Sequence, residues 1–162
     1  MYYIQPYSEI HRRAVKAIGF DTFDVSVRPG LISALHEASP HSLILQKNDE
    51  VVGFALLSYK SPHRGLPKGL ELAFLGIHED HQGMGLGSEM LKHILSLNFQ
   101  HFWLNVSYTN PDAQRLYERY GFCRWRFIGN KAEGGIMMGY SKQMRQGLGQ
   151  RQRIQKSKNM SV

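Results

Sequence analysis

Three glycines, Gly83, Gly85 and Gly87, alternate with larger residues directly before a segment whose apolar residues recur at helical spacing. Glycine tolerates positive φ and lets a ligand approach the backbone closely, while the first turn of a helix carries unpaired N–H groups. Together these features are typical of a phosphate-binding site. An ordinary glycine-rich turn has the same residues, so the glycines alone leave both interpretations open.

Two common phosphate-binding motifs are excluded by the end of this loop. A Walker loop requires a lysine between its last glycine and the following serine or threonine, but Gly87 is followed immediately by Ser88. The dinucleotide pattern G-x-G-x-x-G, counted from Gly83, requires a third glycine where Ser88 stands. We therefore expect a phosphate-containing ligand of another kind.

A second motif identifies this ligand by resemblance. The segment "QGMGLG", residues 82–87, resembles the Gln/Arg-x-x-Gly-x-Gly/Ala signature of the GNAT family of N-acetyltransferases, and "NPDAQRLYERYGF", residues 110–122, is similar to a second segment of that family. The resemblance implies acetyl-coenzyme A (acetyl-CoA) as co-substrate, with its pyrophosphate on the loop and the following helix. The implied pyrophosphate-binding residues are Gln82, Gly83, Met84, Gly85, Leu86, Gly87 and Ser88.

The same resemblance implies contacts to acetyl-CoA outside the loop. Backbone N–H groups of Leu75 and Ile77 are expected to pair with the pantetheine arm as an added strand would, and to polarise the thioester carbonyl. Gly76 between them would allow close approach or mark a bulge. Asn110 is a further implied contact, although its position before Pro111 also predicts a helix N-cap, which explains it adequately.

The candidate general base is Glu71, the one ionisable side chain in the apolar segment "GLELAFLGI". A lysine-like amine is neutral only about once in 2,500 molecules at pH 7, so a base is useful for transfer to an amine. Burial would raise the pKa of the Glu71 carboxyl toward neutrality. By resemblance, the histone-acetylating branch of the family has its catalytic glutamate at this same interval of eleven residues before the loop. An ion pair with Lys68 or Arg64 is an equally supported interpretation.

Other groups near the two motifs have simpler expected roles. His78, Glu79 and His81 are the alternative bases, but the order "HEDH" lacks the spacing and third ligand of a zinc site, so we expect no metal. Tyr117 is by resemblance the acid that protonates the departing CoA thiolate, although its helical spacing also fits a core residue. Cys123 is expected to be a small buried residue rather than a nucleophile.

A sheet with helices around it must position these residues. Apolar runs and alternation predict strands at residues 2–7, 42–47, 51–59, 70–77, 102–107, 123–129 and 136–141. Helical spacing predicts helices at residues 8–18, 30–38, 86–98 and 110–120, and "KNDE", residues 47–50, predicts a hairpin turn. Their order predicts an α/β (α+β mixed sheet) protein with the GNAT fold, in which about seven mixed strands are flanked by about four helices on both faces.

Composition sets the expected domain organisation and compartment. The 162 residues are enough for one GNAT domain over residues 1–142, followed by a basic, disordered tail over 143–162 that holds five Lys or Arg residues and no acid. This tail accounts for most of the net charge of +7. A single cysteine excludes an internal disulfide, and no apolar run approaches the roughly 20 residues of a membrane helix. We therefore expect a cytoplasmic protein without membrane contact.

The resemblance predicts an N-acetyltransferase that moves an acetyl group from acetyl-CoA to a primary amine of a small molecule or protein by direct attack in a ternary complex. Residues 11–30 and the basic segment 61–69 would line its acceptor groove. Two alternatives stay open. The first is an acetyltransferase directed at RNA, such as a toxin acting on aminoacyl-tRNA, which would bind phosphates through the basic tail and is less favoured. The second is a non-catalytic acyl-CoA-binding module. The sequence leaves a homodimer open.

Overall fold

The computed structural model describes residues 1–59, 68–128 and 134–142 of the chain. Its contacts divide the chain into two compact units, Met1–Asn98 and Phe99–Val162, which are described separately below. The described residues form seven strands and four α-helices, which confirms the predicted α/β class. The tail at 143–162 and most of the basic segment 61–69 lie outside the described residues, so their expected roles and the domain boundary at residue 142 stay predictions.

Four neighbouring antiparallel strands form the sheet of the first unit. They are β1 (Tyr2–Pro6), β2 (Leu43–Lys47), β3 (Glu50–Ser58) and β4 (Leu70–Ile77). Asn48 and Asp49 join β2 to β3 with φ values of 50° and 64°. Positive φ at both central residues is the conformation of the tight turns that suit the twist of a hairpin, so the predicted turn is confirmed.

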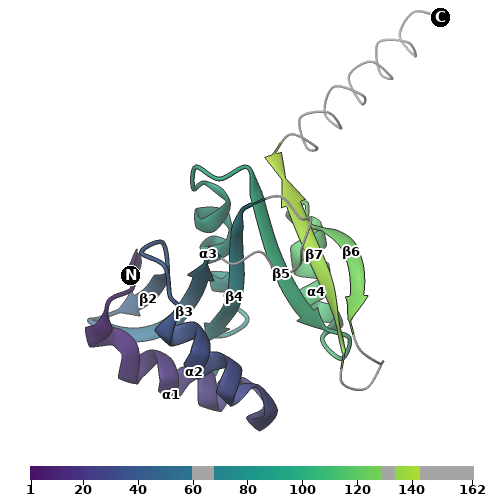
Figure 1. The fold of residues 1–162 in the computed structure, drawn as a ribbon. Helices are drawn as coiled ribbons and strands as arrows, with labels where there is room; N and C mark the ends of the chain where they lie inside the picture. Colours follow the sequence, from purple (N-terminus) through teal and green to yellow (C-terminus); the bar gives the residue numbers. More distant parts are fainter. Residues whose placement is uncertain (60–67, 129–133, 143–162) are drawn as a thin grey trace, which may run out of the picture. The chain divides into compact units, whose positions relative to one another are not determined.

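Helices cover both faces of this sheet. Figure 1 shows α1 (Arg12–Thr22) and α2 (Arg28–His36) in front of the strands and α3 (Leu86–Leu95) behind them. Fully apolar residues fill the layer between the front helices and the sheet because α1 and α2 each present one apolar face to it. This core contains Val15, Ile18, Leu31, Ala34, Leu35, Ile44, Phe54 and Leu56.

The first helix differs from its predicted limits. Ser8 does not begin α1. With His11 it forms a capping box around the short 3₁₀ turn Glu9–His11, and α1 starts directly after this turn, at Arg12. The helix also continues past residue 18, its predicted end, and includes Gly19. A side chain at Gly19 would collide with Leu31, so the glycine allows α1 and α2 to approach closely rather than ending the helix.

The second unit contains three strands and one helix. β7 (Gly135–Ser141) pairs antiparallel with both β5 (His101–Ser107) and β6 (Cys123–Ile128), while α4 (Pro111–Arg119) connects β5 to β6. Cys123 is exposed, so the expectation of a buried residue was wrong. Its neighbour Arg124 faces α4; because adjacent strand residues point to opposite faces, Cys123 lies on the face that α4 does not cover.

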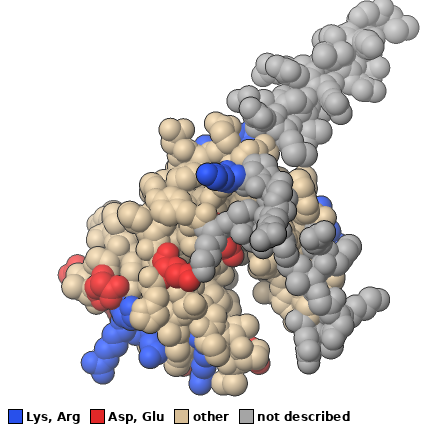
Figure 2. Space-filling model, viewed as in Figure 1, with Lys and Arg blue, Asp and Glu red and all other residues tan. Residues whose placement is uncertain are grey.

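The described surface combines both signs of charge. Figure 2 shows both basic and acidic side chains on the part of the surface near α1 and α2. Separately, an ion pair joins Arg12 Nη1 to Glu9 Oε2 at 3.6 Å. Exposed pairs of this kind keep a surface soluble in water without creating a field of a single sign. Within the described ranges, no helix is long and apolar enough to cross a bilayer.

Candidate acetyl-donor and catalytic site

The glycine loop between β4 and α3 is open on one side. Gly83 and Gly85 have φ values of +75° and +77°, a region that other residues rarely adopt, and Gly85 is the N-cap of α3. Among the described residues, no heavy atom outside the adjoining residues and the helix's own backbone lies within 4 Å of a Cβ placed on Gly83, Gly85 or Gly87. A ligand can therefore approach the backbone here at distances that side chains would prevent.

The first turn of α3 supplies hydrogen-bond donors beside these glycines. The first bond of the helix runs from the Glu89 N–H to the Gly85 carbonyl at 3.1 Å. The N–H groups of Leu86, Gly87 and Ser88 precede it, so the helix itself offers them no acceptor. Open glycines, these N–H groups and the positive end of the helix dipole fit the pyrophosphate expected at this position.

The strand before the loop directs two backbone N–H groups away from its neighbour. The His78 N–H donates to the Val52 carbonyl of β3 at 2.8 Å. Because successive residues of a strand direct their N–H groups to opposite sides, those of Ile77 and Leu75 point away from β3 in the way that the pantetheine contact requires. Gly76 has a different cause: a Cβ there would lie 2.8 Å from Phe54 Cε1, so core packing explains this glycine without a ligand or a bulge.

A bulge in β4 decides the face on which Glu71 lies. Leu56 of β3 pairs with Phe74 and the next residue pairs with Leu72, so Ala73 is extra. Ala73 and Phe74 consequently pack against the same core beneath α1 and α2. Glu71, which is half-buried and paired with Ser58, returns to that same face. The candidate base is therefore on the side of the sheet that carries the helices expected to line the acceptor groove.

The histidines that the sequence offered as alternative bases have local partners. His78 Nδ1 accepts a hydrogen bond from the Asp80 N–H at 3.2 Å, and His81 Nδ1 lies 2.9 Å from the hydroxyl oxygen of Tyr2. Among the residues that the structure describes, no cluster of three or more His, Cys, Asp or Glu side chains could hold a metal ion.

Helix α4 in the second unit carries the candidate acid. Its start is fixed by Asn110, whose Oδ1 accepts from the Ala113 N–H at 3.1 Å, so the predicted N-cap is confirmed. Tyr117 is partly buried and packs edge-on against Phe122, with 5.8 Å between the ring centroids. Burial raises the pKa of Tyr117 to about 12. Its hydroxyl keeps its proton at neutral pH, as an ordinary tyrosine does, and the raised pKa makes it a weaker acid than an exposed tyrosine.

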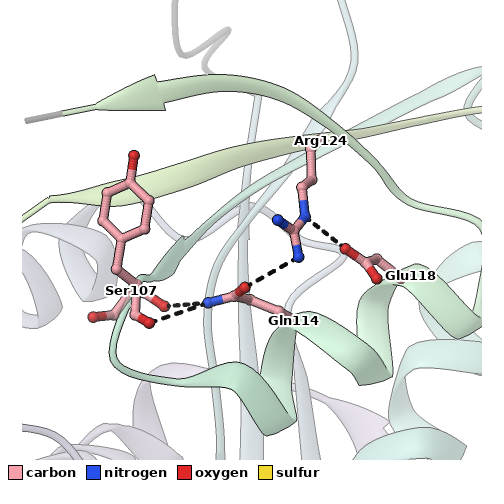
Figure 3. Close-up of polar contacts among 5 residues, drawn as sticks. Ser107, Gln114, Glu118 and Arg124 are labelled. Atoms are coloured by element: carbon pink, nitrogen blue, oxygen red, sulfur yellow. Dashed lines mark hydrogen bonds and ion pairs between the residues drawn. The ribbon is translucent and has the colours of Figure 1, made fainter. Parts of the chain in front are cut away.

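A polar network that the sequence did not reveal holds this helix in place (Figure 3). The buried Gln114 donates from Nε2 to the carbonyl oxygens of Ser107 at 3.0 Å and Tyr108 at 3.4 Å, and its Oε1 accepts from Arg124 Nη2 at 3.5 Å. Arg124 Nε also donates to Glu118 Oε1 at 2.7 Å. The network ties α4 to the end of β5 and to β6.

Sequence reasoning missed Gln114 for an identifiable reason. It recognised the apolar positions of this helix, Ala113 and Leu116, but a glutamine beside them is usually exposed. The only signal available was a polar residue within an otherwise well-matched motif. The contact between Tyr2 and His81 had no signal at all, since the two residues are 79 positions apart.

Two curated proteins with related sequences are acetyltransferases by name. The chain is 27% identical over 96 residues to N-alpha-acetyltransferase 30 of Schizosaccharomyces pombe, a match that covers 57% of the chain and 63% of the relative. It is 35% identical over 52 residues to the 5-NmdU N-acetyltransferase of Pseudomonas phage PaMx11, which covers 32% of the chain and 37% of the relative. The chain thus spans less than two thirds of the length of each.

Solved structures share the fold at low sequence identity. Ard1 from Thermoplasma volcanium superposes with a TM-score of 0.71 at 20% identity, covering 86% of this chain and 97% of its own. A chain from the structure described as the NatC complex bound to Gag peptide and CoA superposes with a TM-score of 0.69 at 17% identity, covering 86% and 98%.

The sequence model of the Acetyltransferase (GNAT) family matches residues 6–122, which is well over half of the chain. With both sequence motifs inside or ending at this range, the chain belongs to the GNAT family of acetyltransferases. The family recognised from the loop and the α4 segment is thereby confirmed. Use of acetyl-CoA is a property of this family. The roles of individual residues stay predictions.

Proposed function

We propose that the chain is an N-acetyltransferase that moves an acetyl group from acetyl-CoA to a primary amine by direct attack in a ternary complex, in the cytoplasm. The observation that carries this proposal is the open glycine loop: two left-handed glycines with free space on one side, followed by the N-terminus of α3. These features supply what a pyrophosphate requires, namely room at the backbone and N–H donors.

In this proposal the pantetheine arm extends along β4, beside the N–H groups that point away from β3. The N–H groups of Leu75 and Ile77, which point away from β3, bind its amides and stabilise negative charge on the thioester oxygen. The thioester supplies an electrophilic carbonyl carbon and a thiolate leaving group. The chain's own contribution is to orient that carbon, to exclude water from it, to accept a proton from the acceptor amine and to donate a proton to the leaving sulfur.

Each proton has its own proposed residue. Glu71 accepts a proton from the acceptor's ammonium group, directly or through water, so that the neutral amine attacks the carbonyl carbon. Tyr117 donates its hydroxyl proton to the sulfur as the carbon–sulfur bond breaks. The attacking nitrogen loses its second proton to water as the amide forms, and exchange with water then returns the Tyr117 hydroxyl and the Glu71 carboxylate to their starting states. The resemblance of the α4 segment to the family motif supports this assignment, together with the partly buried position of Tyr117. The pKa adds nothing to it, since any tyrosine hydroxyl is protonated at neutral pH.

The acceptor we favour is the α-amino group of a protein or peptide, and a small-molecule amine is the second choice. Support comes from the names of relatives: one is an N-alpha-acetyltransferase, and the NatC structure is described as holding a peptide. Both are similar to this chain and neither identifies its acceptor. A primary α-amine also suits a carboxylate base such as Glu71, because its ammonium group, with a pKa near 8, loses a proton more readily than a lysine ammonium does.

Release of free CoA thiol from acetyl-CoA tests the proposal directly. The panel contains peptides with free and blocked N-termini, small amines, polyamines, a modified-nucleoside amine and charged tRNA. Turnover with free but not blocked peptides is the expected result. Turnover with tRNA as the only acceptor would support the RNA-directed function in place of this proposal. In that case, removal of residues 143–162 should abolish the turnover and the salt dependence of tRNA binding. Tight acetyl-CoA binding without turnover on any acceptor would indicate a non-catalytic module. Sedimentation of the same preparation decides between monomer and homodimer.

A further inference from the structure

Tyr2, the first residue of β1, contacts the glycine loop from the far end of the sequence. Its hydroxyl oxygen lies 2.9 Å from His81 Nδ1, and the hydroxyl donates toward Met84 Sδ at 3.4 Å. The Tyr2 and His81 rings meet edge to face, with centroids 5.8 Å apart and planes at 87°. One side chain therefore touches the loop both before and within its glycine run.

This loop has a particular need for anchoring. Met84 stands between Gly83 and Gly85, the two residues with the greatest backbone freedom in the segment, and its side chain is 60% exposed. No side chain of the described residues comes within 4 Å of a Cβ placed on either glycine, so none of these side chains restricts the loop on that side. Ordering such a segment on binding costs entropy, which a loop held beforehand in its bound form avoids.

Tyr2 is itself held firmly enough to serve as an anchor. It pairs with Lys47 across β1 and β2, and Lys47 Nζ lies 5.2 Å from the centroid of the Tyr2 ring. The neighbouring Tyr3 points the other way and is 53% exposed. Tyr2 is thus held by strand pairing and by a cation over its ring, while its ring edge and its hydroxyl reach the loop residues named above.

We propose that Tyr2 is a positioning residue for the binding of acetyl-CoA. Tyr2 holds the loop from His81 to Gly85 in the conformation that receives the pyrophosphate. This inference rests on the proposed function. It assigns the first strand of the fold, far in sequence from both family motifs, a part in donor binding. Tyr2 acts through His81 and Met84 and makes no contact with the reacting atoms.

The Tyr2→Phe variant tests this proposal because it removes only the hydroxyl. Loss of one hydrogen bond corresponds to about a threefold to tenfold rise in the KM and Kd for acetyl-CoA. With acetyl-CoA at saturation, kcat should equal that of the wild type. S-acetylpantetheine, a donor without the pyrophosphate, should show an unchanged kcat/KM, whereas a general structural defect would lower kcat/KM for both donors.

Matched variants complete the test. Tyr3→Phe should bind acetyl-CoA as the wild type does, and Tyr2→Phe combined with His81→Phe should be no worse than either single change if the two side chains act together. Equal acetyl-CoA affinity in wild type and Tyr2→Phe overturns the inference, as do equal losses with both donors. Should the wild-type protein itself fail to bind acetyl-CoA, the proposed function fails first and the two failures remain distinguishable.

Discussion

The side-chain amide of Gln82 donates a hydrogen bond to the carbonyl oxygen of Ile77, with 2.8 Å between nitrogen and oxygen. This bond joins the last residue of β4 to the start of the glycine loop. The two segments expected to bind the pantetheine and the pyrophosphate are therefore linked before any ligand arrives. The link suggests that the family signature requires Gln or Arg at this position because both donate hydrogen bonds.

Replacing Gln82 tests that explanation. Gln82→Leu removes the donor at similar size, so the Kd for acetyl-CoA should rise about threefold to tenfold, measured by titration calorimetry. Gln82→Arg restores a donor and should recover most of the affinity. If leucine and arginine bind acetyl-CoA equally well, the bond to Ile77 has no part in donor binding.

Gly85 and Gly87 separate backbone strain from ligand contact. Gly85→Ala places a side chain at φ +77° and should lower the free energy of unfolding by about 1–2 kcal/mol as well as weakening acetyl-CoA binding. Gly87 lies inside α3, where alanine is the better helix former, so Gly87→Ala should raise stability by up to about 1 kcal/mol. It should nevertheless weaken acetyl-CoA binding. Chemical denaturation and calorimetry measure the two effects; unchanged binding in Gly87→Ala would mean that no ligand approaches this glycine.

Tyr117 should influence both catalysis and alkaline stability. Tyr117→Phe is expected to lower kcat without changing the Kd for acetyl-CoA, and a wild-type kcat would remove the acid role.

The unfolded chain loses the phenolic proton of Tyr117 near pH 10, whereas the folded protein keeps it to about pH 12. Stability contributed by this group is therefore complete below pH 10 and lost as the pH rises toward 12, by about 1–3 kcal/mol. Urea unfolding at pH 9 and pH 11.5 should show a smaller loss in Tyr117→Phe, with Tyr120→Phe as control.

Glu71 should matter most where the acceptor amine is protonated. We expect Glu71→Gln to reduce kcat/KM by roughly tenfold near pH 7 and by progressively less toward pH 9, because an α-amine is neutral in only about one molecule in ten at pH 7 and is mostly neutral at pH 9. A pH–rate profile on the best peptide acceptor measures this. Glu50→Gln, an exposed residue at the start of β3, serves as the control. A deficit of equal size at every pH would assign the base role to water or to the substrate.

The network around Gln114 should contribute to stability. Gln114→Leu leaves the Ser107 and Tyr108 carbonyls without their side-chain donor, so the free energy of unfolding should fall by about 1–3 kcal/mol. Arg115→Ala breaks only the exposed ion pair with Asp112 and should change it by less than about 1 kcal/mol. Thermal unfolding compares the two variants, and equal effects would contradict a structural role for the buried amide.

The local parts of this protein were readable from its residues. Paired turn residues at 48 and 49 and the cap at Asn110 each specify a backbone conformation through their own chemistry, and the structure has both. The spacing of two motifs was likewise sufficient to recognise the family. The end of the first helix near Gly19 was not predictable, because this glycine is required by close packing against Leu31 on another helix.

By itself, then, the sequence determined the class of fold, the family and the place of the phosphate loop, since these depend on residues near one another in the chain. The face on which Glu71 lies, the fixing of α4 by Gln114 and the contact of Tyr2 with the loop were decided only by the tertiary structure. A single extra residue in β4 reverses which side chains face α1 and α2. Tyr2 and Met84 are 82 residues apart and meet only because β1 joins the sheet that ends at the loop.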